Sequence, residues 1–304
     1  MDALIQSLVQ ANFAPERIAP QASMAQYTTL RIGGPAEVMV NIHSADEIAV
    51  ALRAAKQADA PVTIIGNGSN LLVRDGGIRG LVLRISGGLN AIRREGNCLL
   101  VQAGASLAAV AAFARDEGLS GMAELGGIPG TVGGGVLMNA GAYGAELAQL
   151  VTQAEGVSLS DGRRVIYPAD RLDFAYRHSA LMDAGVVITQ ATLALTPGDP
   201  EAIRARMEEC AKARREKQPL TLPSAGSTFK RPEGHFAAKL IDDCGLRGLT
   251  VGGAQVSEKH AGFIVNIGGA TARDMLELMR QVEQRVFEQT GVQLEPEIRI
   301  LGED

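Results

Sequence analysis

The chain has 304 residues, of which 46% are hydrophobic and 21% are charged. This composition is ordinary for a globular protein and excludes a largely disordered one, and the length suggests about two domains with a sizeable core. The 29 basic and 34 acidic residues give a net charge of −5. This balance argues against a general nucleic-acid binder, because that class carries a basic excess.

Cellular location is indicated by the cysteines and by the lack of targeting segments. Cys98, Cys210 and Cys244 lie far apart and form no CxxC pair, which argues against a disulfide framework and against a metal site. The N-terminus lacks the basic region of a signal peptide, and no apolar run approaches the ~20 residues of a membrane span. We therefore expect a soluble cytoplasmic protein with no metal and no membrane insertion.

The first two thirds of the chain predict short strands with helices between them. Ser44 is placed to cap a helix that runs to about Gln57, and Ser106 is placed to cap a second helix that ends at Gly118. Segments rich in valine, isoleucine and leucine predict strands at Ala36–Ile42, Val62–Ile65, Leu81–Ile85, Leu99–Ala103, Arg164–Tyr167 and Val186–Leu195.

The C-terminal third begins at Asp199, where aspartate at the N-cap and proline at the next position open a charged helix to about Lys217. The segments that follow predict a helix at 236–244, a strand at 263–267, a helix at 272–289 and a strand at 298–301. Thr271 is placed to cap the long helix and Gly291 to end it, and its apolar residues fall at helical spacing, which indicates core. The whole pattern is typical of an α+β chain.

A first glycine loop, Gly66–Asn70, directly follows a predicted strand. Its glycines permit left-handed backbone angles, so successive N–H groups can converge on an anion, and Ser69 and Asn70 add side-chain donors. It is not a Rossmann fingerprint, because Leu71 replaces the third glycine, and it lacks the Lys-Ser/Thr of a Walker A loop. By itself, the loop is equally compatible with a glycine-rich hairpin turn.

A second glycine run, Gly126–Gly135, is followed by Asn139–Gly144. Such a run is costly to order, because glycine loses the most backbone entropy on folding. This favours close packing of backbone against a large ligand over a purely structural use. Two separated nests of N–H groups suit a diphosphate with long arms on both sides, which describes a dinucleotide.

Together, Gly66–Asn70, Gly127–Gly134 and Asn139–Gly144 resemble the UDP-N-acetylenolpyruvoylglucosamine reductase family, flavoenzymes of bacterial peptidoglycan synthesis. The likeness runs from about Tyr27 to Arg299. It implies an FAD-binding domain of the p-cresol methylhydroxylase type, with two lobes at about 1–85 and 86–198, and an α+β substrate-binding domain at 199–304. The family's longer type inserts a tyrosine-bearing loop for which residues 248–260 leave little room, so the chain resembles the shorter type.

The resemblance implies one FAD per chain, with NADPH as co-substrate. Covalent attachment is not expected, because no histidine lies between His43 and His178 and Cys98 falls in a predicted strand. We expect a monomer or a weak oligomer that binds no nucleic acid. The expected FAD contacts are Gly66, Asn67, Gly68, Ser69, Asn70, Leu71, Gly127, Gly130, Thr131, Gly133, Gly134, Asn139, Gly141 and Ala142.

Three polar residues outside the glycine segments are candidates for catalysis. Arg177 follows Tyr176 in the family's Tyr-Arg-x-Ser motif, Ser227 lies in Ala-Gly-Ser-Thr-Phe-Lys, and Glu297 lies in Glu-Pro-Glu-Ile-Arg. The resemblance assigns Arg177 and Glu297 to the enolic charge and Ser227 to protonation of the substrate's C2. From the residues alone, a surface ion pair at Arg177, a serine–glycine turn at Ser227 and a solvated pair of Glu297 with Arg299 remain open alternatives.

Basic residues are also needed to meet the two phosphates of a UDP-sugar. Lys217 and Lys230 flank the serine motif and are the preferred candidates, together with Tyr176 as a further substrate contact, whereas Lys239 and His260 are weaker ones. Taken alone, each lysine is more typical of a solvated surface charge than of a phosphate ligand. Two rival functions remain: another flavin oxidase on the same FAD scaffold, and a nucleotide-binding protein without catalysis.

Overall fold

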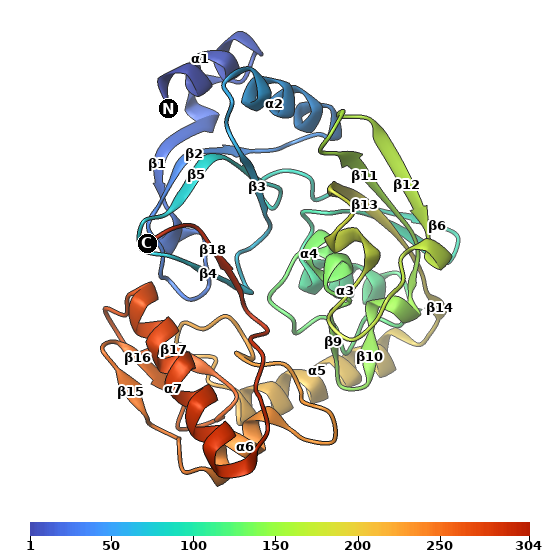
Figure 1. Ribbon diagram of the computed structural model, residues 1–304. Helices are drawn as coiled ribbons and strands as arrows, with labels where there is room; N and C mark the ends of the chain where they lie inside the picture. The colour runs from blue at the N-terminus through green and yellow to red at the C-terminus, as the bar shows by residue number, and fades with distance from the viewer. The chain divides into compact units, whose positions relative to one another are not determined.

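The computed structural model describes residues 1–304 and contains both helices and strands throughout (Figure 1). The chain divides into two compact units. The first unit comprises Met1–Pro20, Val38–Asn67 and Gly80–Ala213, and the second comprises Gln21–Glu37, Gly68–Arg79 and Arg214–Asp304. The expected functional domains, 1–198 and 199–304, describe what each part binds and stay a prediction.

The first unit contains an antiparallel five-stranded sheet in the order β12-β11-β13-β7-β6. The sheet residues Leu99, Val101 and Leu193 are fully buried, and they pack with the buried faces of the helices α3 and α4. The strands are β6 (Ile92–Glu95), β7 (Cys98–Gln102), β11 (Val151–Ser158), β12 (Arg164–Pro168) and β13 (Val186–Ala194), and the helices are α3 (Leu107–Asp116) and α4 (Val132–Leu137).

A second, four-stranded sheet has the order β1-β2-β5-β3, and β3 and β5 pair in parallel with Val62 opposite Leu81. Its strands are β1 (Ile18–Ser23), β2 (Pro35–Asn41), β3 (Val62–Ile65) and β5 (Ile78–Arg84). The helices α1 (Asp2–Gln10) and α2 (Ala45–Gln57) contact each other. Short pairs elsewhere are β8 (Leu119–Ser120) with β14 (Thr196–Pro197), and β9 (Gly141–Ala142) with β10 (Ala145–Glu146).

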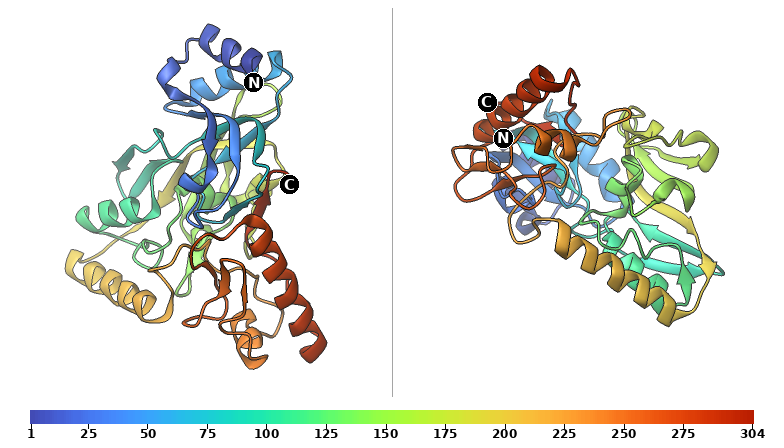
Figure 2. Two further views of the ribbon diagram at one scale, coloured as in Figure 1. Left: turned by 90° about the vertical axis from the view of Figure 1, so that its left-hand side faces the viewer. Right: turned by 90° about the horizontal axis from the view of Figure 1, so that it is seen from below.

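In the second unit, α7 packs on a small antiparallel sheet of β15, β16 and β17 (Figure 2). The expected core face of α7 is confirmed, since Met275, Leu278, Met279, Val282 and Val286 are all buried. The elements are α6 (Ala237–Asp243), β15 (Thr250–Val251), β16 (Ala254–Val256), β17 (Ile264–Asn266) and α7 (Ala272–Thr290). β4 (Leu71–Val73) pairs in parallel with β18 (Arg299–Leu301).

The predicted helix boundaries are confirmed by their caps. The side chains of Ser44, Ser106, Asp199 and Thr271 each accept backbone N–H groups two or three residues further along the chain. Gly291 ends α7 with φ +73, a left-handed angle that suits glycine. The charged helix predicted after Asp199 is α5 (Pro200–Lys217).

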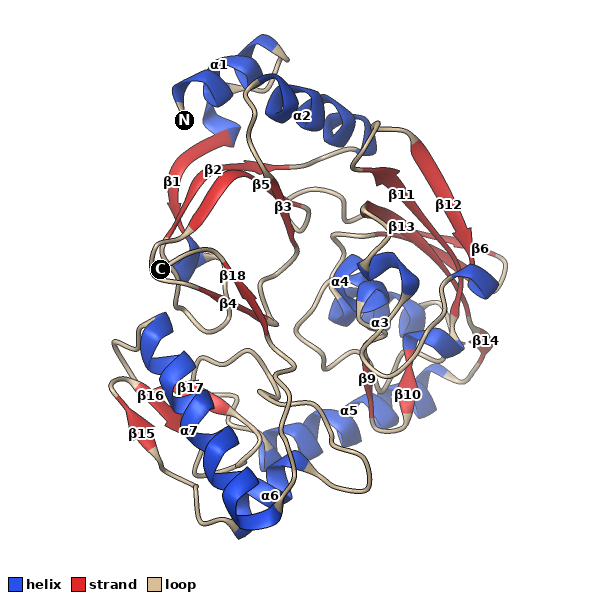
Figure 3. Cartoon of the chain, viewed as in Figure 1, coloured by secondary structure: helices blue, strands red, loops and turns tan.

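Figure 3 shows the helices and strands of the chain. Several of them were not predicted, and these are short or have a weak sequence pattern. The helix α1, the strand β11 and the helix α4 are the main ones. Short 3-10 turns lie at Pro15–Arg17, Met24–Gln26, Leu147–Gln149, Ala169–Arg171 and Ala180–Met182. None of the helices has both the length and the apolar character needed to cross a membrane.

Candidate active site

The first glycine loop connects β3 to β4 and keeps three backbone donors unpaired. Gly68 has φ +62, and a Cβ placed on it would overlap the carbonyl oxygen of Tyr27. The N–H groups of Asn67, Gly68 and Ser69 donate to no acceptor in the protein. Since buried or half-buried backbone donors are normally paired, these three N–H groups are available to an anionic ligand.

Residues Thr131–Gly135 of the second glycine run form a helix start and not the expected nest. Thr131 is the N-cap of α4, and its Oγ1 accepts the N–H of Gly134 at 3.3 Å. The N–H groups of Val132 and Gly133 donate to the carbonyls of Ala105 and Ala103, each at 2.8 Å. The N–H groups that open α4 are therefore used within the protein. At the start of α4, the glycines instead allow other parts of the chain to pack closely against the backbone.

Close approach is needed at two points of the first unit. A Cβ on Gly133 would lie 2.9 Å from the Cβ of Ala103, so this helical glycine lets α4 pack tightly. A Cβ on Gly66 would lie 2.6 Å from Oγ1 of Thr131. The first glycine loop thus contacts the start of α4, which brings together two segments that lie more than 60 residues apart in the sequence. Gly134, by contrast, is exposed.

Asn139, Gly141 and Ala142 follow α4 in a tight hairpin. Gly141–Ala142 pairs with Ala145–Glu146, and the two turn residues, Tyr143 and Gly144, both have positive φ. Asn139 is 1% exposed, and both ends of its amide bind backbone groups: Oδ1 accepts the N–H of Ala148 and Nδ2 donates to the carbonyl of Ala175. Contact of these three residues with FAD stays a prediction.

Arg177 lies in a two-residue turn of the first unit. Ala175 and His178 exchange two backbone hydrogen bonds of 3.1 Å around Tyr176 and Arg177. Arg177 has φ +55, and its guanidinium carbon lies 5.0 Å from the centre of the Tyr176 ring. Tyr176 itself is 51% exposed. The turn therefore presents an arginine on an exposed aromatic ring.

Ser227 and Glu297, which lie 70 residues apart in the sequence, belong to adjoining segments of the second unit. The N–H of Glu297 donates to the carbonyl of Thr228 at 2.8 Å, and the N–H of Lys230 donates to the carbonyl of Glu295 at 2.8 Å. Phe229 forms a β-bridge with Pro296 between these two bonds. The segments that carry two of the three predicted catalytic residues thus pair through their backbones.

The first glycine loop also reaches the glutamate segment. Nδ2 of Asn70 donates to the carbonyl of Glu297 at 3.2 Å, and the N–H of Arg299 donates to the carbonyl of Asn70 at 2.9 Å. The parallel pairing of β4 with β18 then continues this contact, with Leu71 opposite Arg299. Asn70 and Leu71 therefore lie against Glu297 and its neighbours, whether or not they also bind a cofactor.

The residues that hold the serine segment were not predicted from the sequence. The hydroxyl of Thr29 donates to the carbonyl of Ser224 at 2.6 Å, and Oγ1 of Thr228, which is 2% exposed, accepts the N–H of Ile264 at 3.0 Å. Asn266 donates its own N–H to the carbonyl of Pro223 at 2.9 Å. Polar residues this deeply buried normally have hydrogen-bond partners, but a sequence does not show which ones.

The predicted phosphate-binding lysines differ in what occupies their ammonium groups. Lys217 ends α5, is exposed and has no partner in the protein. Lys230 forms an ion pair with Glu295 at 3.1 Å on the surface. Their contact with substrate phosphates stays a prediction, and Lys217 is the one whose charge is not already paired.

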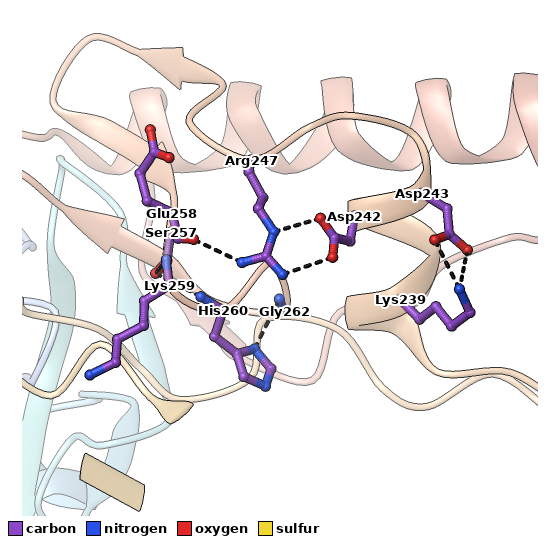
Figure 4. Close-up of polar contacts among 9 residues, drawn as sticks. All are labelled: Lys239, Asp242, Asp243, Arg247, Ser257, Glu258, Lys259, His260 and Gly262. Atoms are coloured by element: carbon purple, nitrogen blue, oxygen red, sulfur yellow. Dashed lines mark hydrogen bonds and ion pairs between the residues drawn. The ribbon is translucent and has the colours of Figure 1, made fainter. Parts of the chain in front are cut away.

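The two weaker candidates, Lys239 and His260, line a shallow surface cavity of about 290 Å³. Lys239 binds Asp243 at 2.8 Å, and the guanidinium of Arg247 faces the carboxylate of Asp242 (Figure 4). Burial lowers the pKa of His260, and its Nδ1 accepts the N–H of Gly262 at 3.2 Å. Because two of these cations are paired with carboxylates of α6, the cavity offers little charge to an anion.

Comparison with known proteins assigns both parts of the chain. Residues 36–166 match the FAD binding domain, and residues 218–301 match the C-terminal domain of UDP-N-acetylenolpyruvoylglucosamine reductase. The reductase of that name from Pediococcus pentosaceus is 47% identical over 98% of this chain and 99% of its own length. The one from Agathobacter rectalis is 49% identical over 92% of both chains.

The chain belongs to the UDP-N-acetylenolpyruvoylglucosamine reductase family. The crystal structure of the reductase from Thermus caldophilus superposes with a TM-score of 0.80, at 38% identity, over 92% of this chain and 97% of that one. These matches confirm the resemblance, the α+β fold with an FAD-binding domain, and the prediction of an FAD-dependent oxidoreductase.

The geometry fits the cofactor that this reductase family implies. A diphosphate needs several donors in a small space, and the loop at Asn67–Ser69 has three unpaired N–H groups. A large ligand needs backbone without side chains, and Gly134 offers an exposed glycine beside the contact of Gly66 with Thr131. No three histidine, cysteine, aspartate or glutamate side chains are gathered in a way that could hold a metal ion.

Proposed function

We propose that this reductase converts UDP-N-acetylglucosamine enolpyruvate to UDP-N-acetylmuramate, with NADPH as the electron donor, in the synthesis of peptidoglycan precursors in the cytoplasm. The double bond of the enolpyruvyl group gains a hydride at its terminal carbon and a proton at C2, which leaves a lactyl ether. The observation that supports the proposal is the backbone pairing of the segments that carry Ser227 and Glu297, the proposed proton donor and the proposed carboxylate.

FAD, bound without a covalent link, supplies the hydride chemistry of both half-reactions. The loop at Asn67–Ser69 would bind its diphosphate, and the glycines at the start of α4 would admit its bulk. Cys98 lies within β7, paired opposite Ala194, and this position supports a cofactor without a thioether attachment. The proposed contacts with FAD remain those expected from the sequence: Gly66–Leu71, Gly127, Gly130, Thr131, Gly133, Gly134, Asn139, Gly141 and Ala142.

Different residues of the chain are proposed to act on different parts of the substrate. The guanidinium of Arg177 presents paired donors to the substrate carboxylate, whose negative charge grows as hydride arrives at the terminal carbon. The hydroxyl of Ser227 donates the proton to C2. A serine hydroxyl is a weak acid, so it needs a basic intermediate or a neighbouring group to help it, and Glu297 is the carboxylate nearest along the paired segments.

Substrate binding is proposed for residues 199–304, with Lys217 and Lys230 meeting the UDP phosphates and Tyr176 as a further contact from the arginine turn. The unpaired ammonium of Lys217 supports this role more directly than the Lys230–Glu295 pair does. NADPH is proposed to use the same flavin face as the substrate, as the reductase family implies, and the lack of a separate dinucleotide fingerprint for NADPH in the sequence fits this arrangement. A monomer or weak oligomer is proposed as the working form.

The test measures NADPH oxidation by the purified holoprotein with and without UDP-N-acetylglucosamine enolpyruvate, under anaerobic conditions and in air. We expect NADPH to be consumed in proportion to added substrate and UDP-N-acetylmuramate to be formed. Rapid oxidation in air that ignores the substrate would support a flavin oxidase in place of the reductase. Protein without a flavin spectrum would support a nucleotide-binding protein without catalysis.

A further inference from the structure

The backbone of the arginine turn is strained at Arg177. Its φ of +55 lies in the left-handed region, which a residue with a Cβ rarely adopts. Arg177 occupies the second of two turn positions between Ala175 and His178, whose backbone groups bond each other at 3.1 Å. A strained conformation of this kind persists only where the surrounding structure fixes it. The residues that fix it therefore determine where the guanidinium points.

Two buried side chains hold the turn, one on each side. Nδ2 of Asn139 donates to the carbonyl of Ala175 at 3.1 Å, before the turn. Oγ of Ser179 donates to the carbonyl of Leu137 at 2.7 Å, after the turn. Asn139 is 1% exposed and Ser179 is 0% exposed, so both donor side chains are buried. Oδ1 of Asn139 is itself fixed by the N–H of Ala148 at 2.9 Å.

Both bonds lead back to the end of the helix α4. Leu137 is the last residue of α4, and Asn139 follows it with φ +45, another left-handed angle outside glycine. The same helix begins at Val132, between Thr131 and Gly133, where the cofactor is proposed to pack. A single helix of six residues thus connects the proposed flavin segment to the turn that carries Arg177.

We propose that Asn139 and Ser179 are positioning residues that set the place of the Arg177 guanidinium for reduction of the enolpyruvyl substrate. The proposal rests on the proposed function, in which Arg177 is a catalytic residue. It also gives Asn139 a role beyond the expected contact with FAD, because both ends of its amide bind backbone groups. Neither side chain touches the substrate in this account; both act through Arg177.

The experiment follows the two half-reactions of the holoprotein by rapid-mixing absorbance at saturating NADPH and at saturating substrate. Ser179→Ala removes one hydroxyl and leaves no clash. We expect flavin reduction by NADPH to stay within about threefold of the wild-type rate, and reoxidation by the substrate to slow by about tenfold or more, since small misplacements of a catalytic group are costly. Asn139→Gly, which keeps φ +45 accessible, should slow reoxidation by a similar factor. Unchanged flavin reduction is expected only of Ser179→Ala, because Asn139 belongs to the proposed FAD contact set.

The decisive arm repeats Ser179→Ala in an Arg177→Ala background. Alanine retains the Cβ and hence the backbone strain, but it has no guanidinium to misplace. We expect no further slowing of reoxidation beyond about twofold, because residues that act through one another are not additive. The matched control is Thr189→Val, which removes another buried hydroxyl bonded to a backbone carbonyl of the same unit, at 3.2 Å, and should change neither half-reaction.

The outcomes separate the positioning role from the proposed function. A tenfold loss that persists without the arginine, or equal slowing of both half-reactions, would overturn the positioning role. Failure of both Ser179→Ala and Asn139→Gly to fold with bound flavin would also overturn it, since the side chains would then hold the fold and not the arginine. If Arg177→Ala itself reoxidises at the wild-type rate, the assignment of Arg177 in the proposed function is wrong.

Discussion

Glu297 donates its backbone N–H to the carbonyl oxygen of Thr228 at 2.8 Å. Thr228 follows Ser227 directly, so this bond fixes the proposed proton donor and the proposed carboxylate in one register. Thr228 is in turn held by its N–H to the carbonyl of Gly262 at 2.9 Å and by its buried hydroxyl. The serine segment is therefore fixed on two sides within the second unit, which is what a positioned acid requires.

The first prediction tests the close approach at Gly68. Gly68→Ala should lose its flavin on gel filtration, because any Cβ at this position overlaps the Tyr27 carbonyl and disturbs the loop whose N–H groups are unpaired. The matched control is Gly96→Ala, which has the same φ of +62 but nothing within 4 Å of an added Cβ. Gly96→Ala should keep its flavin, and its stability should fall only by the ~1 kcal/mol that a left-handed backbone costs alanine. Full flavin content in Gly68→Ala would remove this loop from the site.

The second prediction separates two adjacent glycines of α4. Gly133→Ala should lower the melting temperature of the apoprotein, because the new Cβ lies 2.9 Å from that of Ala103. The Cβ of Gly134→Ala would meet nothing closer than 3.5 Å, and the change replaces an exposed helical glycine. The apoprotein of this variant should therefore be as stable as the native apoprotein, or up to about 1 kcal/mol more stable. Its FAD affinity should still fall by at least about tenfold, as measured by fluorescence titration. An unchanged affinity would show that FAD does not pack on Gly134.

The third prediction concerns acid stability at the start of α7. The backbone N–H of Thr271 lowers the pKa of Asp274, and the Thr271 hydroxyl and the Gly253 N–H lower it further. A carboxylate whose pKa is lower when folded than when unfolded stabilises the protein above the unfolded value of about 3.9, and this contribution is lost as pH falls through the folded value. Asp274→Asn should therefore reduce the melting temperature at pH 7 and lose this effect at low pH.

The control for this prediction is Glu288→Gln in the last turn of α7. It removes the same charge where the helix dipole does not favour an anion, so it should not reduce the melting temperature. Melting curves between pH 7 and pH 2 check both variants. If Asp274→Asn lowers the melting temperature by the same amount at every pH in this range, the ionised carboxylate has no role.

Local signals in the sequence were sufficient to predict much of the fold. Ser44, Ser106 and Thr271 cap their helices as expected, because an N-cap is decided by residues three positions apart. The helix α4 was missed because four of the residues from Thr131 to Val136 are glycine or threonine, which have low helix propensity. Its helical form depends on the carbonyls of Ala103 and Ala105, which accept its first N–H groups.

In the candidate site too, the sequence predicts the local motifs but not the contacts between residues that lie far apart in the chain. The sequence indicated Ser227 and Glu297 only through motifs, and nothing in either motif shows that Glu297 bonds to Thr228. The contact of Gly66 with Thr131, and the bonds of Asn139 and Ser179 around Arg177, likewise join residues that lie from 36 to 65 positions apart. Such pairings are set by packing of the folded chain, so the sequence alone does not predict them.

The most direct test of the account measures both half-reactions in Ser227→Ala. Flavin reduction by NADPH asks nothing of a proton donor to the substrate, and it should stay within about tenfold of the native rate. Reoxidation by UDP-N-acetylglucosamine enolpyruvate should slow by at least about 100-fold, the usual effect of losing a positioned acid, and Ser227→Cys should recover part of the loss. Equal slowing of both half-reactions would make Ser227 structural, and unchanged reoxidation would place the acid elsewhere, with Glu297 as the next candidate.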